Sequence, residues 1–469
     1  MKLTNPTLKA ATLCAAMLAW SFGTAAGQPS APWAPNPPKM PDWLTELSLG
    51  AKESYDDNVL LVAGKTTPLN PAAMSRQDSW VTTLSPTIGM NFAPADGKTL
   101  QALSLVYAPD FVFLHEMPAV NYNAHKIGGK IKGQTGNFSY SWDNDFLFND
   151  GSSTAPTYGL GSSADQGDRC GSAFASAMVR DRVKQIQERA TVALKYDTDR
   201  FFIRPTATLL MYDFMTDWHA NASGLHTGYQ NYTDRTDVNG GADLGWKVTS
   251  GMAVTLGYRY GHQYQQAFTP AIYNIEVNHH PMQSSSDYQR VLLGAEGKPW
   301  KWLTVKLAGG PDFRAYNPAA PVDDNHPTTY FAEAGLTATL TANQTLTFNY
   351  KQWQWVSSVG RVPYFDSTYA LNYHWKASEK LGLDLGGRFL EYDYSAGSAT
   401  LSHNSSLRDD ALYTVSAGVS YAFTAHFTAS LGYACDLGRN LESGLPASLY
   451  PEYREFNRQT ISLSAKYKF

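Results

Sequence analysis

Residues 460–469, which end the chain, read TISLSAKYKF. Apolar and polar side chains alternate through this stretch: Ile461, Leu463, Ala465, Tyr467 and Phe469 share one parity, and hydroxyl groups and lysines share the other. Because successive side chains of a β-strand point to opposite faces, the pattern predicts a strand with one apolar and one polar face. Such a strand must present its two faces to two different environments.

The same alternation recurs from about residue 43 to the end of the chain, for example over 254–260, 303–307 and 413–423. Short clusters of turn-forming residues separate some of the runs: 93–98, 134–137, 197–200, 249–252, 297–301, 342–344, 377–380 and 424–426. Longer polar segments separate the others: 60–77, 151–181, 216–229, 269–286, 317–327, 396–407 and 441–453. Short and long connections therefore take turns along the chain.

Sorting of connections by length is typical of transmembrane β-barrels, which have short periplasmic turns and long extracellular loops. We therefore expect residues 43–469 to form an all-β, antiparallel, up-and-down transmembrane barrel of about 18 strands (16–18). Aromatic residues near the strand ends fit the two aromatic girdles of such a barrel, whereas a soluble sandwich would not predict two bands. On the long-loop side these residues include Tyr107, Phe111, Phe146, Tyr212, Tyr258, Trp353 and Trp355.

The composition excludes several other classes of protein. Lysine and arginine (37) nearly balance aspartate and glutamate (41), so no basic surface for nucleic acid is expected. A mean hydropathy of -0.33 excludes a bundle of transmembrane helices. Only 3 cysteines are present, so no disulfide framework is expected, although Cys170 and Cys435 allow a single bridge between a long loop and the wall.

The first 42 residues differ from the rest. Residues 1–27 combine Lys2 and Lys9 with an uncharged apolar run and small residues near position 26, which predicts a secretory signal peptide. Residues 28–42 are rich in proline and predict an extended periplasmic linker. This segment is too short for a plug domain, which argues against an energy-coupled receptor.

Two stretches resemble known outer-membrane proteins. Residues 50–59 (GAKESYDDNV) and 80–89 (WVTTLSPTIG) are similar to the opening hairpin of the β-barrel porin type 2 family. Tyr467 and Phe469 resemble the terminal signal that the barrel-assembly machinery reads. The resemblance implies a barrel in the outer membrane of a Gram-negative bacterium, sometimes associated with exopolysaccharide operons. It implies no particular substrate and no catalytic or binding residue.

The polar parity of the strands supplies the predicted lumen wall, and a barrel of this size has room inside for water. The predicted pore-lining residues are Lys126, Lys130, Lys132, Arg189, Lys195, Arg204, Arg235, Lys247, Arg259, Lys306, Arg314, Arg388, Asp143, Asp243, Glu333 and Asp384. One interpretation is a charged wall that biases passage, with a slight basic excess that favours anions. The other interpretation is that these residues form cross-strand ion pairs that hold the barrel in shape. The two interpretations are compatible.

We expect a passive channel for small hydrophilic solutes or oligosaccharides. The alternatives are a barrel for exopolysaccharide export and a structural or adhesive protein with a closed lumen. No enzymatic activity is expected, because nothing aligns the rim residues His219, His226 and His403 with a serine in a triad. Asp56, Asp57 and Asn58 lack the spacing of a calcium loop, so no metal or cofactor is expected. The expected partners are outer-membrane lipid, the assembly machinery, the solute or polysaccharide and further copies of the chain.

Overall fold

The computed structural model describes residues 40–59, 61, 76–94, 97–118, 121–150, 185–213, 234–265, 283–318, 320, 322–356, 363–394, 409–441 and 455–469. The predicted signal peptide (1–27) and loop 151–181 lie outside the described residues, as does most of the predicted linker (28–42). Cys170, His219, His226 and His403 also lie outside them. Among the residues that the structure describes, no helix is long and apolar enough to cross a membrane.

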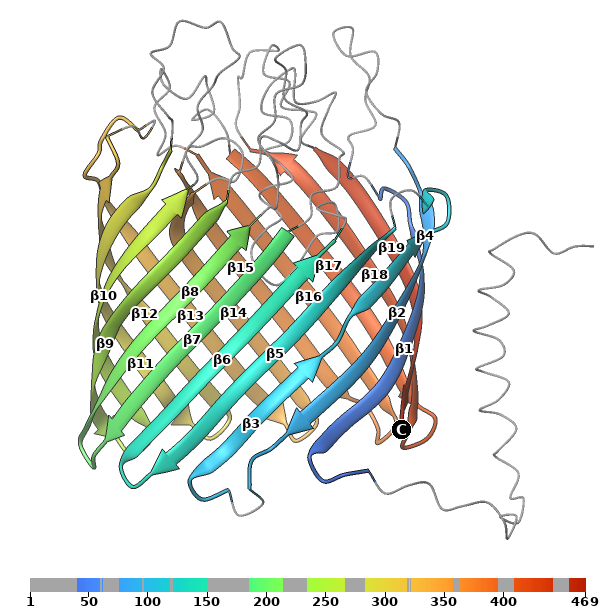
Figure 1. The fold of residues 1–469 in the computed structure, drawn as a ribbon, viewed down its shortest axis with the longest axis horizontal. Helices are drawn as coiled ribbons and strands as arrows, with labels where there is room; N and C mark the ends of the chain where they lie inside the picture. The colour runs from blue at the N-terminus through green and yellow to red at the C-terminus, as the bar shows by residue number, and fades with distance from the viewer. Residues whose placement is uncertain are drawn as a thin grey trace, which may run out of the picture.

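The described chain forms nineteen strand segments that run up and down in sequence order (Figure 1). They are β1 (Leu44–Asp56), β2 (Ser79–Asn91), β3 (Leu100–Tyr107), β4 (Asp110–Leu114), β5 (Tyr122–Thr135), β6 (Phe138–Asn149), β7 (Gln185–Asp197), β8 (Phe201–Asp213), β9 (Arg235–Thr249), β10 (Met252–Gln265), β11 (Ser286–Trp300), β12 (Leu303–Tyr316), β13 (Thr328–Thr341), β14 (Gln344–Val356), β15 (Pro363–Lys376), β16 (Leu381–Asp393), β17 (Asp409–Ala422), β18 (Phe427–Asn440) and β19 (Phe456–Lys468).

The sheet closes on itself. Neighbouring strands pair antiparallel, and β1 pairs with β19 from Ser48↔Lys468 to Asp56↔Thr460. β3 and β4 form one barrel strand, because both pair with β2 on one side and with β5 on the other in unchanged register. Pro109 lies at the break between them and has no N–H to give to the ladder. The predicted closed, antiparallel barrel of 18 strands is therefore confirmed.

The short turns lie at the lower end of the barrel in Figure 1, together with the C-terminus and the start of β1. Gly136 in the β5–β6 turn has φ 58, a left-handed conformation that glycine adopts without steric cost. The opposite end holds the longer connections, with two exceptions. β4 and β5, and likewise β14 and β15, are joined at that end by only a few residues, so the expected sorting by length is incomplete.

The two faces of the sheet differ as the alternation predicts. Leu293, Val415 and Trp246 are 66%, 61% and 58% exposed on the outer face, and Trp300 stacks on Trp302 near the short turns. Toward the long-loop end exposed tyrosines and polar side chains form a border: Tyr260 and Tyr330 are 51% and 67% exposed, and the Tyr258 hydroxyl donates to Gln289. A band of exposed apolar side chains between an aromatic girdle and a polar border is stable against lipid, so the barrel spans a membrane.

Three aromatic residues are not in the girdle to which the sequence assigned them. Tyr212, Trp353 and Trp355 are only 1%, 8% and 2% exposed, and they belong to a buried cluster. Nearness to a strand end was the wrong criterion, because parity decides the face. Trp353 and Trp355 share the parity of Lys351, which pairs across the ladder with Glu333 of the inner wall.

A candidate constriction inside the barrel

The upper end of β14 leaves the barrel wall. Pairing between β13 and β14 stops at Ala332↔Gln352, although β13 begins at Thr328 and β14 runs on to Val356. Pairing between β14 and β15 continues to Val356↔Pro363. Residues 353–356 of β14 are thus separated from β13 but remain paired with β15. Together with residues 363–364 of β15 they form the end of this hairpin. We call these residues the hairpin tip.

Polar side chains from distant strands hold the backbone of the hairpin tip. Gln263 Nε2 on β10 and Arg314 Nη2 on β12 donate to the carbonyl oxygen of Gln354 at 2.9 and 3.0 Å. Arg235 Nη1 on β9 donates to the carbonyl oxygen of Val356 at 2.9 Å. All three donor side chains are buried. Since β9, β10 and β12 are not neighbours of β14 in the wall, the tip lies inside the lumen.

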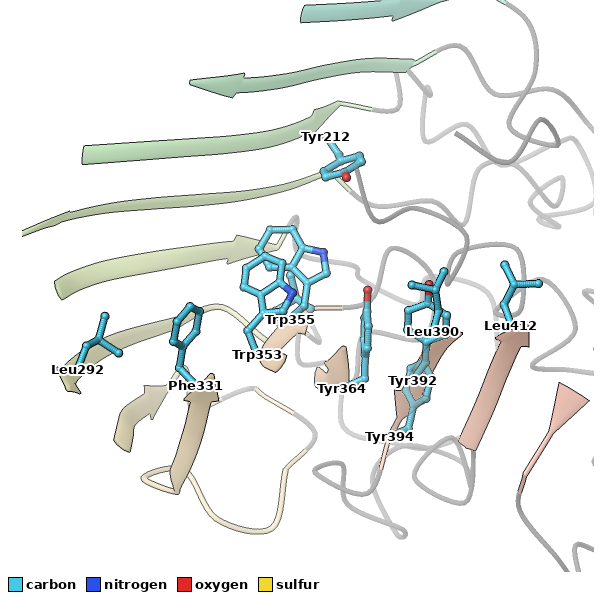
Figure 2. Close-up of a cluster of buried hydrophobic side chains, with 11 residues drawn as sticks. Tyr212, Leu292, Phe331, Trp353, Trp355, Tyr364, Leu390, Tyr392, Tyr394 and Leu412 are labelled. Carbon is cyan, nitrogen blue, oxygen red and sulfur yellow. The ribbon is translucent and has the colours of Figure 1, made fainter. Parts of the chain in front are cut away.

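Aromatic packing surrounds the tip. Figure 2 shows Trp353 and Trp355 side by side, with Tyr212 reaching toward them from β8. The two tryptophan rings stack with centroids 4.6 Å apart, and Tyr364 stacks on Tyr394 at 5.0 Å. The cluster as a whole draws on strands from β8 to β17: Tyr212, Leu292, Phe331, Trp353, Trp355, Val356, Tyr364, Leu390, Tyr392, Tyr394 and Leu412. It narrows the lumen near the long-loop end.

Cations are stacked against these rings. The guanidinium of Arg235 lies 4.6 Å from the ring centroid of Tyr212 and 5.3 Å from that of Trp355. Arg290 lies between the rings of Tyr288 and Phe331, at 4.1 and 4.8 Å. Such contacts between a cation and an aromatic face contribute about 2 kcal/mol when they are desolvated.

Among the described residues that interact around the tip, cations outnumber carboxylates. Arg290 and Arg314 share one carboxylate, that of Asp312, at 2.7 and 3.0 Å. Lys351 Nζ lies 3.8 Å from the ring centroid of Trp353 and interacts electrostatically with Arg189 and Arg290, and with two aspartates. The cations of this group are Arg189, Arg235, Arg290, Arg314 and Lys351, and the carboxylates are Asp237, Asp312 and Asp366.

The wall nearer the short turns has a different character. Lys130 pairs with Asp143 at 3.3 Å and Lys306 with Glu333 at 3.1 Å, and both lysine side chains are more than half exposed. His374 contacts Asp384 at 2.7 Å and is equally open. Exposed pairs of this kind contribute at most about 1 kcal/mol each. These side chains border an open space rather than a packed one.

The pairing registers place all sixteen predicted pore-lining residues on the face opposite the exposed apolar band. Many pair across the ladder, as Arg204 and Arg259 do with Asp243 at 3.0 and 2.7 Å. Arg235 and Arg314 do not line open space as expected, because the hairpin tip buries them. Arg290 and Gln263 were missed, although their parity marks them as inner residues.

The remaining predicted residues lie at the seam and on the outer face. Tyr467 and Phe469 end β19, and the N–H of Phe469 donates to the carbonyl of Leu47 at 2.9 Å. Asp56, one of the calcium candidates, binds Arg458 at 2.5 Å. Among the described residues no group of three or more side chains is arranged to hold a metal ion. Cys435 has outer parity on β18, and its thiol is free.

No family model and no curated protein sequence matches the chain. Solved structures similar to it include the siderophore receptor PirA from Acinetobacter baumannii, with 8% identity and a TM-score of 0.40 over 91% of this chain and 81% of that one. The FrpB iron transporter from Neisseria meningitidis is 7% identical, with a TM-score of 0.42 over 90% of this chain and 81% of that one. A loop-deletion mutant of OmpT, an outer membrane protein of Vibrio cholerae, is 11% identical, with a TM-score of 0.30 over 91% of this chain and 100% of that one.

The location of the protein follows from the barrel's own surface. A closed sheet pairs the backbone groups of neighbouring strands across the apolar band, which is what a membrane requires of a β-structure. Its outer band is apolar and its inner wall is polar. Large barrels of this kind are built into bacterial outer membranes, and the protein is located there.

Proposed function

We propose that this outer-membrane barrel is a water-filled channel for passive diffusion of small hydrophilic solutes or oligosaccharides, narrowed by the hairpin tip. The supporting observation is the inner wall below the tip, where the side chains of Lys130, Lys306 and His374 are 51%, 64% and 54% exposed. A lysine held against lipid would cost about 2–4 kcal/mol at the midplane. Charges this open are stable when water fills the lumen, and a continuous column of water conducts ions.

The charge around the tip bears on which solutes pass. Arg290 and Arg314 share the carboxylate of Asp312, and Lys351 Nζ lies 3.8 Å from the ring centroid of Trp353. A narrow passage beside such a group has a positive potential. We propose that anionic solutes are favoured over cationic ones.

Planar-bilayer recording tests the proposal. Purified protein should give steady conductance steps in salt solution, and liposomes that contain it should swell in small sugars. Heat-denatured protein is the control for detergent leakage. Correctly folded barrels, shown by a heat-dependent shift in gel mobility, that give no conductance would contradict the proposal.

One observation favours a second candidate, a structural or adhesive barrel with a closed lumen. The buried cluster extends from Tyr212 on β8 to Leu412 on β17, about half of the circumference. If the space beside it is also filled, nothing passes. Folded barrels without conductance would support this candidate.

The first hairpin gives further support to an outer-membrane channel. Its residues resemble the opening of the β-barrel porin type 2 family, and we propose membership of that family. We also propose a non-catalytic role, and recognition of Tyr467 and Phe469 by the assembly machinery. Replacement of Phe469 by serine should lower the amount of folded barrel in the outer membrane without changing the conductance of barrels that do assemble.

A further inference from the structure

Where the hairpin tip departs, no described residue pairs with one edge of β13. Residues 328–331 of β13 still pair with β12, from Gly310↔Phe331 to Phe313↔Thr328. On their other edge the β14 ladder has already ended, at Ala332↔Gln352. Continuing that register would bring Tyr330 opposite Gln354, and Thr328 opposite Val356. The wall therefore offers the tip a second position, with a register that is already set.

The hydrogen bonds of the tip point to the same second position. Alternate residues of a strand direct their N–H and C=O groups to the same edge. Gln354 and Val356 are alternate residues, and Gln263, Arg314 and Arg235 occupy their carbonyl oxygens. β15 holds the opposite edge of β14. The three side chains thus take the place of donors that β13 would supply in an unbroken ladder.

Side-chain parity suits both positions. Trp353 and Trp355 have inner parity, so they would still face the lumen if the tip joined the wall. Gln354 has outer parity and would join the polar border beside Tyr330, which is 67% exposed. The movement would therefore bring into contact with lipid no side chain that is better suited to water.

A hinge is present on the other side of the hairpin. β15 remains paired with β16 as far as Phe365↔Asp393, and with β14 along its whole length. Residues 363–364 extend beyond the β15–β16 ladder, but the ladder between β13 and β14 ends earlier, at Gln352, which lies opposite Ser367. Rotation about the β15–β16 ladder would therefore carry the tip between the lumen and the wall without unpairing the hairpin.

We propose that the hairpin tip is a gate with two positions. In the closed position Arg235, Gln263 and Arg314 hold it in the lumen. In the open position it completes the β13–β14 ladder. Closing uses three side-chain hydrogen bonds to the tip carbonyls and opening forms about four backbone hydrogen bonds, so the two positions are similar in hydrogen bonding. The consequence for conductance rests on the proposed channel function, whereas the movement itself does not.

A cross-strand disulfide tests the movement directly. The variant Tyr330→Cys/Gln354→Cys, made in the full chain without the native cysteines, places thiols opposite each other only in the open position. Directly opposed residues of an antiparallel pair have Cα atoms about 4.5–5.5 Å apart, which a disulfide spans. Ala332→Cys/Gln352→Cys is the matched control, because these residues are already paired and lie one step down the same ladder.

Both variants are reconstituted in lipid vesicles, oxidised, and mapped by mass spectrometry of linked peptides. We expect a disulfide in both, because oxidation traps the open position whenever it is visited. A disulfide in the control alone would show that the tip stays in the lumen, and would overturn the proposal. Bilayer recording adds a separate result: the disulfide between positions 330 and 354, which locks the tip in the open position, should raise conductance severalfold. A reductant should reverse the increase. A disulfide formed in barrels that never conduct would support the gate but reject the channel.

Discussion

The two ends of the barrel use their inner-facing charged residues differently. Near the short turns, lysines, aspartates and glutamates pair across neighbouring strands and are still exposed, as Lys306 and Glu333 show. Near the long loops, arginines are buried beneath the hairpin tip and stack on aromatic rings, as Arg235 and Arg290 show. The inner wall is thus open at one end and packed at the other.

This difference shows what a barrel gains when one strand leaves the wall. In a lumen lined only by the wall, side chains reach strands a few places away, as Arg204 on β8 reaches Glu296 on β11, and water competes for these contacts. The hairpin tip brings a backbone edge to β9, β10 and β12 at once. Those contacts are desolvated, so each is worth more than a solvated ion pair. Substitutions at the packed end should therefore have larger effects.

Trp355→Ala should have the largest effect. Trp355 is 2% exposed, stacks on Trp353 and contacts Arg235, and loss of a buried tryptophan costs about 3–5 kcal/mol. The tip should leave the lumen, which would raise single-channel conductance and lower the temperature of unfolding. Trp300→Ala in the outer girdle is the matched control. Unchanged conductance in Trp355→Ala would mean that the tip does not narrow the passage.

Arg314→Gln should have the next largest effect. Its Nη2 donates to the carbonyl of Gln354, and its Nη1 donates to Gln263 at 2.6 Å. Hydrogen bonds to charged groups contribute about 1.5–3 kcal/mol. The carboxylate of Asp312 still has Arg290 as its ion-pair partner in this variant. Channel recordings should show more frequent or longer open events, and a record indistinguishable from wild type would argue against this anchor.

The wall could be predicted from the sequence because period-two alternation carries the necessary information locally. In β19, Ile461 and Leu463 alternate with Ser462 and Ser464, which fixes the outer and inner faces without reference to any other strand. Glycine and asparagine at 136–137 likewise specify a tight turn on their own. The number of strands, their direction and the face on which each side chain lies followed from such local signals.

The hairpin tip could not be predicted in this way, because it depends on where pairing stops. Trp353 and Trp355 continue the alternation of β14 whether the strand stays in the wall or leaves it. Their buried positions depend on Tyr212 and Arg235, which lie more than a hundred residues earlier in the chain. The remaining local signal was the short connection between Val356 and Pro363, one of two short connections at the long-loop end.

Lys351→Met tests whether the charge excess at the packed end influences ions. Lys351 lies over the ring of Trp353 and interacts electrostatically with Arg189 and Arg290. One charge at ~15 Å and an effective dielectric constant of 20 is worth about 1 kcal/mol, or roughly fivefold in relative permeability. The reversal potential in a potassium chloride gradient should shift toward cation preference. A shift of the opposite sign would contradict the proposed anion preference.

Lys306→Gln should have the smallest effect, and it calibrates the comparison. Lys306 meets Glu333 at 3.1 Å with its side chain 64% exposed, so removing the charge should change stability by less than about 1 kcal/mol. Salt screens exposed charges beyond about 8 Å at physiological ionic strength. Any change in ion selectivity should therefore fade as salt is raised, whereas the change in Lys351→Met should fade less, because Lys351 is partly buried and lies against Trp353. If Lys306→Gln altered conductance as strongly as Arg314→Gln, the narrowest part of the lumen would lie at the open end of the barrel and not at the hairpin tip.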